Sequence, residues 1–116
     1  MLSFAQDRSI QFETTSFKMA LDKARENDKL LFVDCYTSWC GPCKMMKPVL
    51  EELKKKMGNK IIILKIDIDK NISLSSEYRI QSVPTLVLWK QGEIIWRQSG
   101  ALSLNELEQI LSSYIR

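Results

Sequence analysis

The chain of 116 residues is 45% apolar and 27% charged, which is the composition of a single ordinary globular domain. Its net charge of +3 is too small to indicate a nucleic-acid-binding protein, and no apolar stretch approaches the roughly 18 residues of a membrane span. We therefore expect one domain over residues 1–116, with residues 1–9 as a poorly ordered extension, and partners that are neither nucleic acid nor membrane.

The N-terminal residues bear on the cellular compartment. Ser3-Phe4-Ala5 fits the small-x-small end of a signal-peptide cleavage site, but no apolar segment precedes it. We therefore expect a cytoplasmic protein, with a trimmed periplasmic or secreted protein as the alternative.

Hydrophobic periodicity predicts the first three elements. Ile10–Glu13 is a candidate for a short strand. A helix follows, with Thr15 or Ser16 available as its N-cap. Its apolar residues recur at helical spacing: Phe17, Ala20, Leu21 and Ala24. Leu30–Tyr36 is then a nearly unbroken apolar run, as expected of a strand that is covered on both faces.

The middle of the chain predicts a second helix and another buried strand. The helix carries a single apolar stripe: Met46, Val49, Leu50, Leu53 and Met57. Pro48 lies inside this helix, and Gly58 is placed to end it. Ile61–Asp67 follows as the next buried strand.

The last third of the chain predicts a short helix, a hairpin and a final helix. The short helix lies between Asn71 and Arg79. Thr85–Lys90 and Glu93–Gln98 are two β-rich runs, and Gln91-Gly92 between them is a plausible hairpin turn. Ser103-Leu104-Asn105-Glu106 is a capping box, which opens the final helix.

The resulting order of elements is β α β α β α β β α, which predicts an α/β fold. Strands that are separated by helices are expected to pair in parallel through right-handed crossovers, and the closing hairpin adds an antiparallel edge. The expected architecture is a central mixed β-sheet of about five strands with four helices on both faces.

The chain has three cysteines and no histidine. Three cysteines are too few for a disulfide scaffold, and the lack of histidine excludes Cys-His and Ser-His nucleophile pairs and His-ligated metals. Cys35 is expected to be a buried, inert core thiol.

Cys40 and Cys43 lie where the strand Leu30–Tyr36 gives way to the second helix. At a helix start, unpaired backbone N–H groups and the positive end of the helix dipole favour thiolate over thiol. Cys40 is then the nucleophile and Cys43, one helical turn on, resolves the mixed disulfide. Pro42 falls near the first helical position, where its missing N–H costs nothing. The alternatives are half of a zinc site, for which the chain lacks a second ligand pair, and a static structural disulfide.

Asp34 and Lys65 each interrupt an apolar strand. If both strands are central, two ionisable groups point into a low-dielectric interior, which is costly unless they serve each other or a reaction. Burial raises the pKa of a carboxyl group, so Asp34 can take the proton from Cys43 as a general base, with Lys65 tuning it. Taken alone, such a charged residue can instead face solvent at an edge strand.

Together these residues resemble the thioredoxin family. Trp39-Cys40-Gly41-Pro42-Cys43-Lys44 matches the active-site motif of that family, and Asp34 matches its buried aspartate. Lys65 lies where the family has a lysine near that aspartate, Pro48 matches the proline in its second helix, and Val83-Pro84-Thr85 matches its cis-proline loop. The resemblance covers nearly the whole chain. Cys35-Tyr36 departs from it, because many bacterial members carry two aromatic residues there.

The resemblance implies a thioredoxin fold, a cis bond between Val83 and Pro84, and a shallow apolar patch around Cys40 that pairs with an incoming peptide. The members carried over to this patch are Trp39, Gly41, Pro42, Ile68, Val83, Pro84 and Gly100.

The activity implied is reduction of protein disulfides, because Gly41-Pro42 places no histidine between the cysteines, where oxidising relatives usually carry one. The expected protein is a monomer without metal or cofactor, and its electrons come from a flavin-containing, NADPH-dependent thioredoxin reductase. A secreted form would need a membrane thiol donor. The alternatives are a secreted disulfide oxidase or isomerase and a non-catalytic binding module on the same fold.

Overall fold

The computed structural model describes residues 14–115. The expected strand Ile10–Glu13, the extension over residues 1–9 and the Ser3-Phe4-Ala5 motif lie outside the described residues.

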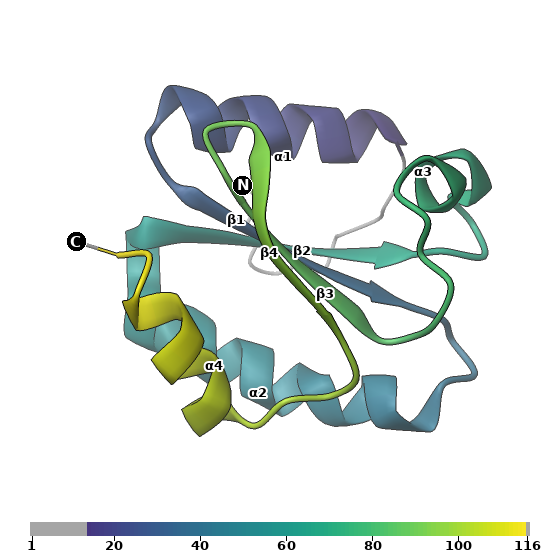
Figure 1. Ribbon diagram of the computed structural model, residues 1–116. Coiled ribbons are helices and arrows are strands. Elements are labelled where there is room, and N and C mark those ends of the chain that lie inside the picture. Colours follow the sequence, from purple (N-terminus) through teal and green to yellow (C-terminus); the bar gives the residue numbers. More distant parts are fainter. Residues whose placement is uncertain (1–13, 116) are drawn as a thin grey trace.

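One mixed sheet and four α-helices make up the described part of the chain (Figure 1). The helices are α1 (Thr14–Glu26), α2 (Gly41–Met57), α3 (Ile72–Glu77) and α4 (Leu104–Ser112). The strands are β1 (Leu30–Tyr36), β2 (Ile61–Asp67), β3 (Thr85–Lys90) and β4 (Glu93–Ser99). A single 3₁₀ turn, η2 (Gly58–Lys60), follows α2. None of the helices described is long and apolar enough to cross a lipid bilayer.

The strand order is β2-β1-β3-β4. β1 and β2 pair in parallel, which places Asp34 beside Lys65. β3 runs antiparallel to both β1 and β4. The expectation of parallel pairing for every pair of strands separated by a helix is therefore wrong for β3.

The short length of α3 agrees with the direction of β3. Six helical residues span about 9 Å, whereas a seven-residue strand such as β2 spans about 23 Å. α3 does not carry the chain back along the sheet, and β3 enters the sheet from the end at which β1 and β2 leave it. Figure 1 shows α3 at that end.

The sheet has four strands in the described residues where about five were expected, because the fifth candidate lies outside them. As a result β2 is an edge strand of the described sheet. We expected Asp34 and Lys65 to be buried if both of their strands were central. In the described sheet β1, which carries Asp34, is central, whereas β2, which carries Lys65, is at the edge.

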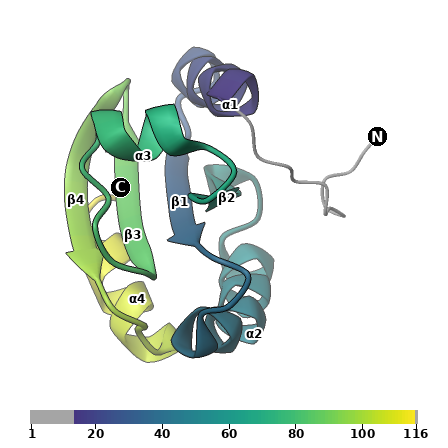
Figure 2. The same cartoon turned by 90° about the vertical axis from the view of Figure 1, so that its right-hand side faces the viewer.

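Alternation of side chains along the strands builds two cores, one on each face of the sheet. α1 and α3 cover one face, while α2 and α4 cover the other (Figures 1 and 2). In β1, Leu31, Val33 and Cys35 belong to the core under α1 and α3. Leu30 and Phe32 belong to the core under α2 and α4. Asp34 alternates with Leu30 and Phe32, so its side chain points to the face of the sheet that α2 covers. Cys40 and Cys43 lie at the start of α2.

The helix ends are stabilised by local hydrogen bonds. The capping box of α4 is confirmed, since Ser103 and Glu106 each accept the other's backbone N–H. Arg79 follows α3 with a φ of 54° and donates its N–H to the Ser76 carbonyl, while Ile80 donates to the Ser75 carbonyl. These bonds satisfy carbonyl groups that a helix C-terminus leaves free.

The expected N-cap of the first helix is wrong. Thr15 and Ser16 both lie inside α1, because its described part already begins at Thr14.

The hairpin turn is as expected at Gln91-Gly92, and both residues have positive φ, 51° and 83°. This is the geometry whose twist matches that of two flanking strands. β4 extends one residue beyond the expected Gln98, to Ser99. The Gln91 side chain also donates to the Asp28 carboxylate at 2.8 Å, which ties the turn to the end of α1.

Candidate active site

Cys40 and Cys43 form a disulfide at the start of α2, with an S–S distance of 2.11 Å and Cα atoms 5.3 Å apart. Cys40 is the N-cap of the helix, and its Sγ accepts the Cys43 backbone N–H at 3.1 Å. Pro42 stands in the first helical turn, as expected. The helix N-terminus therefore points a backbone N–H and the positive end of its dipole at Cys40 Sγ, which stabilises negative charge on that sulfur.

Trp39 lies beside the disulfide and is 71% exposed. Its Nε1–H donates to Asp69 Oδ2 at 3.0 Å, while the Asp69 backbone N–H donates to Asp67 Oδ1. The bond anchors a large exposed ring next to the cysteines. Sequence reasoning missed Asp69, because this contact joins residues 30 positions apart in different loops.

A second loop carries the cis-proline. The Val83–Pro84 peptide bond is cis, as the resemblance implied, and Pro84 is buried. Gly100, with a φ of 102°, donates its N–H to the Pro84 carbonyl at 2.8 Å. Thr85 pairs with Cys35 across the sheet, so Pro84 lies next to the end of β1 from which the chain continues to the disulfide.

Asp34 is fully buried, with 0% of its surface exposed. Neither carboxylate oxygen has a hydrogen-bond partner among the described residues. Burial raises the pKa of Asp34 from 3.8 to about 6, and the charge of Lys65 opposes this rise. A carboxyl group with a pKa near neutrality can exchange protons with a thiol at physiological pH.

Lys65 is half-buried on β2. Its Nζ lies over the ring of Tyr36, 4.7 Å from the ring centroid. No hydrogen bond joins it to Asp34 in the described structure, although the two residues are neighbours in the β1–β2 register. Lys65 therefore acts on Asp34 through its field and not through a hydrogen bond.

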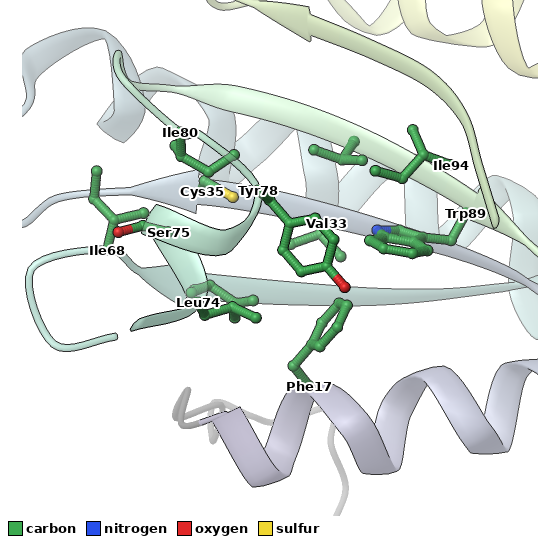
Figure 3. A pocket seen from close by; sticks show the side chains of 12 residues that line it. Phe17, Val33, Cys35, Ile68, Leu74, Ser75, Tyr78, Ile80, Trp89 and Ile94 are labelled. Atoms are coloured by element: carbon green, nitrogen blue, oxygen red, sulfur yellow. The ribbon is translucent and has the colours of Figure 1, made fainter. Parts of the chain in front are cut away.

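Ile68, Cys35 and their neighbours lie on the other face of the sheet. Ile68 packs against the core under α1 and α3 and lines an apolar pocket there that is partly open to solvent (Figure 3). Cys35 lines the same pocket, and burial, reinforced by the charge of Asp34, raises its pKa to about 12.

Two further features near the disulfide were not expected from the sequence. Thr37 follows β1, and its carbonyl accepts the Cys40 N–H at 3.4 Å. Its hydroxyl is buried without a partner among the described residues. Met45, in the first turns of α2, is exposed. Between residues 14 and 115, no cluster of three or more His, Cys, Asp or Glu side chains is suited to hold a metal ion.

Comparisons with known proteins agree with this geometry. A sequence model of the family described as Thioredoxin matches residues 8–113. The chain is 38% identical over 91 residues to the thioredoxin of Buchnera aphidicola, an alignment that covers 78% of this chain and 84% of that protein. The chain belongs to the thioredoxin family. As in other thioredoxin-family proteins, its cysteine pair is a redox-active disulfide, and its activity is that of a thiol–disulfide oxidoreductase that reduces protein disulfides.

Two more thioredoxins show how far the likeness extends. The chloroplastic thioredoxin Y of rice is 36% identical over 104 residues, which cover 90% of this chain and 62% of the rice protein. A solved structure of a mutant thioredoxin from Halobacterium salinarum has a TM-score of 0.74 and 35% identity, and covers 83% of either chain. The thioredoxin fold is therefore shared across the sheet and the helices that hold the disulfide.

Proposed function

We propose that the chain reduces protein disulfides with Cys40 as nucleophile, Cys43 as resolving thiol and Asp34 as general base. The observation that supports these roles best is the position of Cys40 Sγ at the N-cap of α2, where it accepts the Cys43 N–H. A thiolate is the attacking species in disulfide exchange, and this N-cap is the place in the site where a thiolate is most stabilised.

In the first step the Cys40 thiolate attacks one sulfur of the substrate disulfide. A bond forms between Cys40 and that sulfur, the substrate S–S bond breaks, and the other substrate sulfur leaves as a thiolate that takes up a proton. The product is a mixed disulfide between enzyme and substrate.

In the second step Cys43 loses its proton to Asp34, and its thiolate attacks Cys40 Sγ. The mixed disulfide breaks, the second substrate sulfur leaves as a thiolate that is then protonated, and the Cys40–Cys43 disulfide closes. Two electrons have passed from the protein to the substrate. Lys65 tunes Asp34, whose pKa of about 6 suits it to accept this proton near neutral pH.

The substrate binds at the apolar patch around Cys40. Trp39, Gly41 and Pro42 supply one side of it, and Val83, Pro84 and Gly100 supply the other, with Ile68 as a more distant member. An extended substrate segment pairs with the backbone at Val83 as a short added strand. This is supported by the cis-proline loop, which the Gly100 N–H holds beside the end of β1.

The disulfide is the redox group, so the reaction needs neither metal nor organic cofactor. A flavin-containing, NADPH-dependent thioredoxin reductase is the electron donor in the cytoplasm, which is the compartment we propose for this protein. A membrane thiol donor replaces the reductase if the protein is secreted. The protein acts as a monomer, and the described residues 14–115 form one domain.

Cysteine substitutions test this proposal. Cys40→Ser should abolish turnover of a soluble disulfide protein, because Cys40 is the N-cap thiol whose sulfur accepts a backbone N–H of α2. Cys43→Ser should accumulate enzyme–substrate mixed disulfides, visible by non-reducing electrophoresis and mass spectrometry. Cys35→Ala is the matched control and should keep turnover. Full turnover by Cys40→Ser would rule out the assignment of the nucleophile.

A further inference from the structure

The position of the Lys65 ammonium group is unexpected for a lysine beside a buried aspartate. Asp34 and Lys65 are partners in the β1–β2 register. Both point to the α2 face, since Asp34 alternates with Phe32 on β1 and Lys65 alternates with Ile63 on β2. Even so, Lys65 Nζ lies 4.7 Å from the centroid of the Tyr36 ring, and the Asp34 carboxylate has no partner in the described structure.

We propose that Tyr36 is a positioning residue, which holds the Lys65 ammonium over its ring and thereby keeps it from closing an ion pair with Asp34. Tyr36 is two residues from Asp34 on the same strand, so its ring stands on the same face of the sheet. A cation within about 6 Å of an aromatic centroid is attracted by the ring quadrupole, the more so where water is excluded. The ring therefore competes with the carboxylate for the ammonium group.

This competition sets how strongly Asp34 binds a proton. With Lys65 over the ring, burial dominates and the pKa of Asp34 is about 6. An opposite charge in direct contact lowers the pKa of a carboxyl group by about 1 to 3. An Asp34–Lys65 ion pair would therefore return the carboxyl group toward its ordinary pKa and weaken it as a base near neutral pH.

Among the groups around Asp34, Lys65 is the main charge whose position can change the pKa of Asp34. On β3 its register partner is Leu86, which is apolar. On its own strand the neighbours are Cys35, whose raised pKa keeps it neutral, and Tyr36, whose phenol pKa is also raised. From α2 come the two cysteines, which do not titrate while they form the disulfide. Asp67 on β2 affects Tyr36, and only burial and Lys65 shift the pKa of Asp34.

The inference deepens the proposed function, because it rests on Asp34 acting as the base for Cys43. The test does not depend on that role, since the pKa of Asp34 can be measured without turnover. The oxidised full-length protein is suitable, because its disulfide removes the two active-site thiols from the titration. The pKa of Asp34 is then read from the carboxyl carbon signal by NMR as the pH is raised from about 4 to about 9, a range that brackets the expected titration.

Tyr36→Leu should lower the pKa of Asp34 by about one or more, from about 6 toward its ordinary value. Tyr36→Phe keeps the ring and should keep the pKa within a few tenths of that of the parent protein. The decisive control is the Lys65→Met background, in which Tyr36→Leu should no longer lower the pKa. A role of Tyr36 in packing alone would lower or raise the pKa equally in both backgrounds.

The unsubstituted protein offers a second measurement that depends on no variant folding. Protons on the Lys65 side chain next to Nζ should show upfield ring-current shifts, and Tyr36→Phe should retain them. The proposal is overturned if these shifts are absent, if Tyr36→Leu leaves the pKa of Asp34 unchanged, or if Tyr36→Leu lowers it equally in the parent protein and in the Lys65→Met background. If Asp34 is not the base, Asp34 variants will keep their turnover, and these NMR results will still stand.

Discussion

Asp34 should cost the folded protein stability at neutral pH, and Asp34→Asn should recover it. The pKa of Asp34 rises from 3.8 to about 6 on folding, so the folded state binds the proton more tightly than the unfolded chain does. The stability associated with the protonated carboxyl group is therefore fully present below pH 3.8 and is lost as the pH rises through about 6. Above that range the buried carboxylate is charged in both states and the folded state bears the desolvation cost.

The size of the effect follows from the same pKa values. At about 1.36 kcal/mol for each pKa unit, the rise from 3.8 to about 6 corresponds to about 3 kcal/mol at pH 8. Asp34→Asn removes the charge while it keeps the size of the side chain. Measured from the acid limit, where Asp34 is protonated in both states, the advantage of the variant over the parent protein should grow by about 0.5 kcal/mol at pH 4, about 1.5 kcal/mol at pH 5 and about 3 kcal/mol at pH 8.

The assay is urea denaturation of the oxidised protein at these three pH values, compared between parent and variant. The amide that the substitution introduces also lacks a partner, but that cost is the same at every pH, so the pH dependence carries the test. Glu51→Gln, on the exposed side of α2, is the matched control and should change little at any pH. A gain that does not shrink as the pH falls would show that the charge of Asp34 is not its source.

Two smaller gains in stability should follow from unfavourable local features. Thr37→Val should stabilise the protein by about 1 kcal/mol, because it removes a buried hydroxyl that has no partner among the described residues. Thr37→Ser keeps the hydroxyl and should bring no gain in the same urea titration. Arg79→Gly should add about 1 kcal/mol by relieving a φ of 54°, measured by thermal unfolding. An equal gain from Arg79→Ala, which retains the strain, would contradict that reason.

Local patterns were enough to predict most elements of this fold. The largely apolar runs of 30–36, 61–67 and 85–90 have the bounds of β1, β2 and β3, because a strand covered on both faces needs apolar residues on both. The disulfide was equally predictable, since residues three apart at a helix start are brought together by the helix itself. The capping box at Ser103 is local for the same reason.

What the sequence did not predict depends on contacts between distant segments. The antiparallel direction of β3 depends on the path of the chain through α3, and the edge position of β2 in the described sheet follows from the strand order. The placement of Lys65 over Tyr36 requires both the strand register and a side-chain conformation. The packing of Ile68 against the core under α1 and α3 depends on where the chain leaves β2 and turns toward α3.

Asp34 and Cys35 are neighbours on β1, and their side chains point to opposite faces of the sheet. Asp34 points to the face of the sheet that α2 and α4 cover, whereas Cys35, the next residue, lies in the apolar pocket of the other face with a pKa of about 12. A thiolate-selective reagent should therefore leave Cys35 unlabelled in the folded protein and label it once the chain unfolds. The Cys35 thiol is thus a built-in reporter of unfolding, and it needs no engineered label.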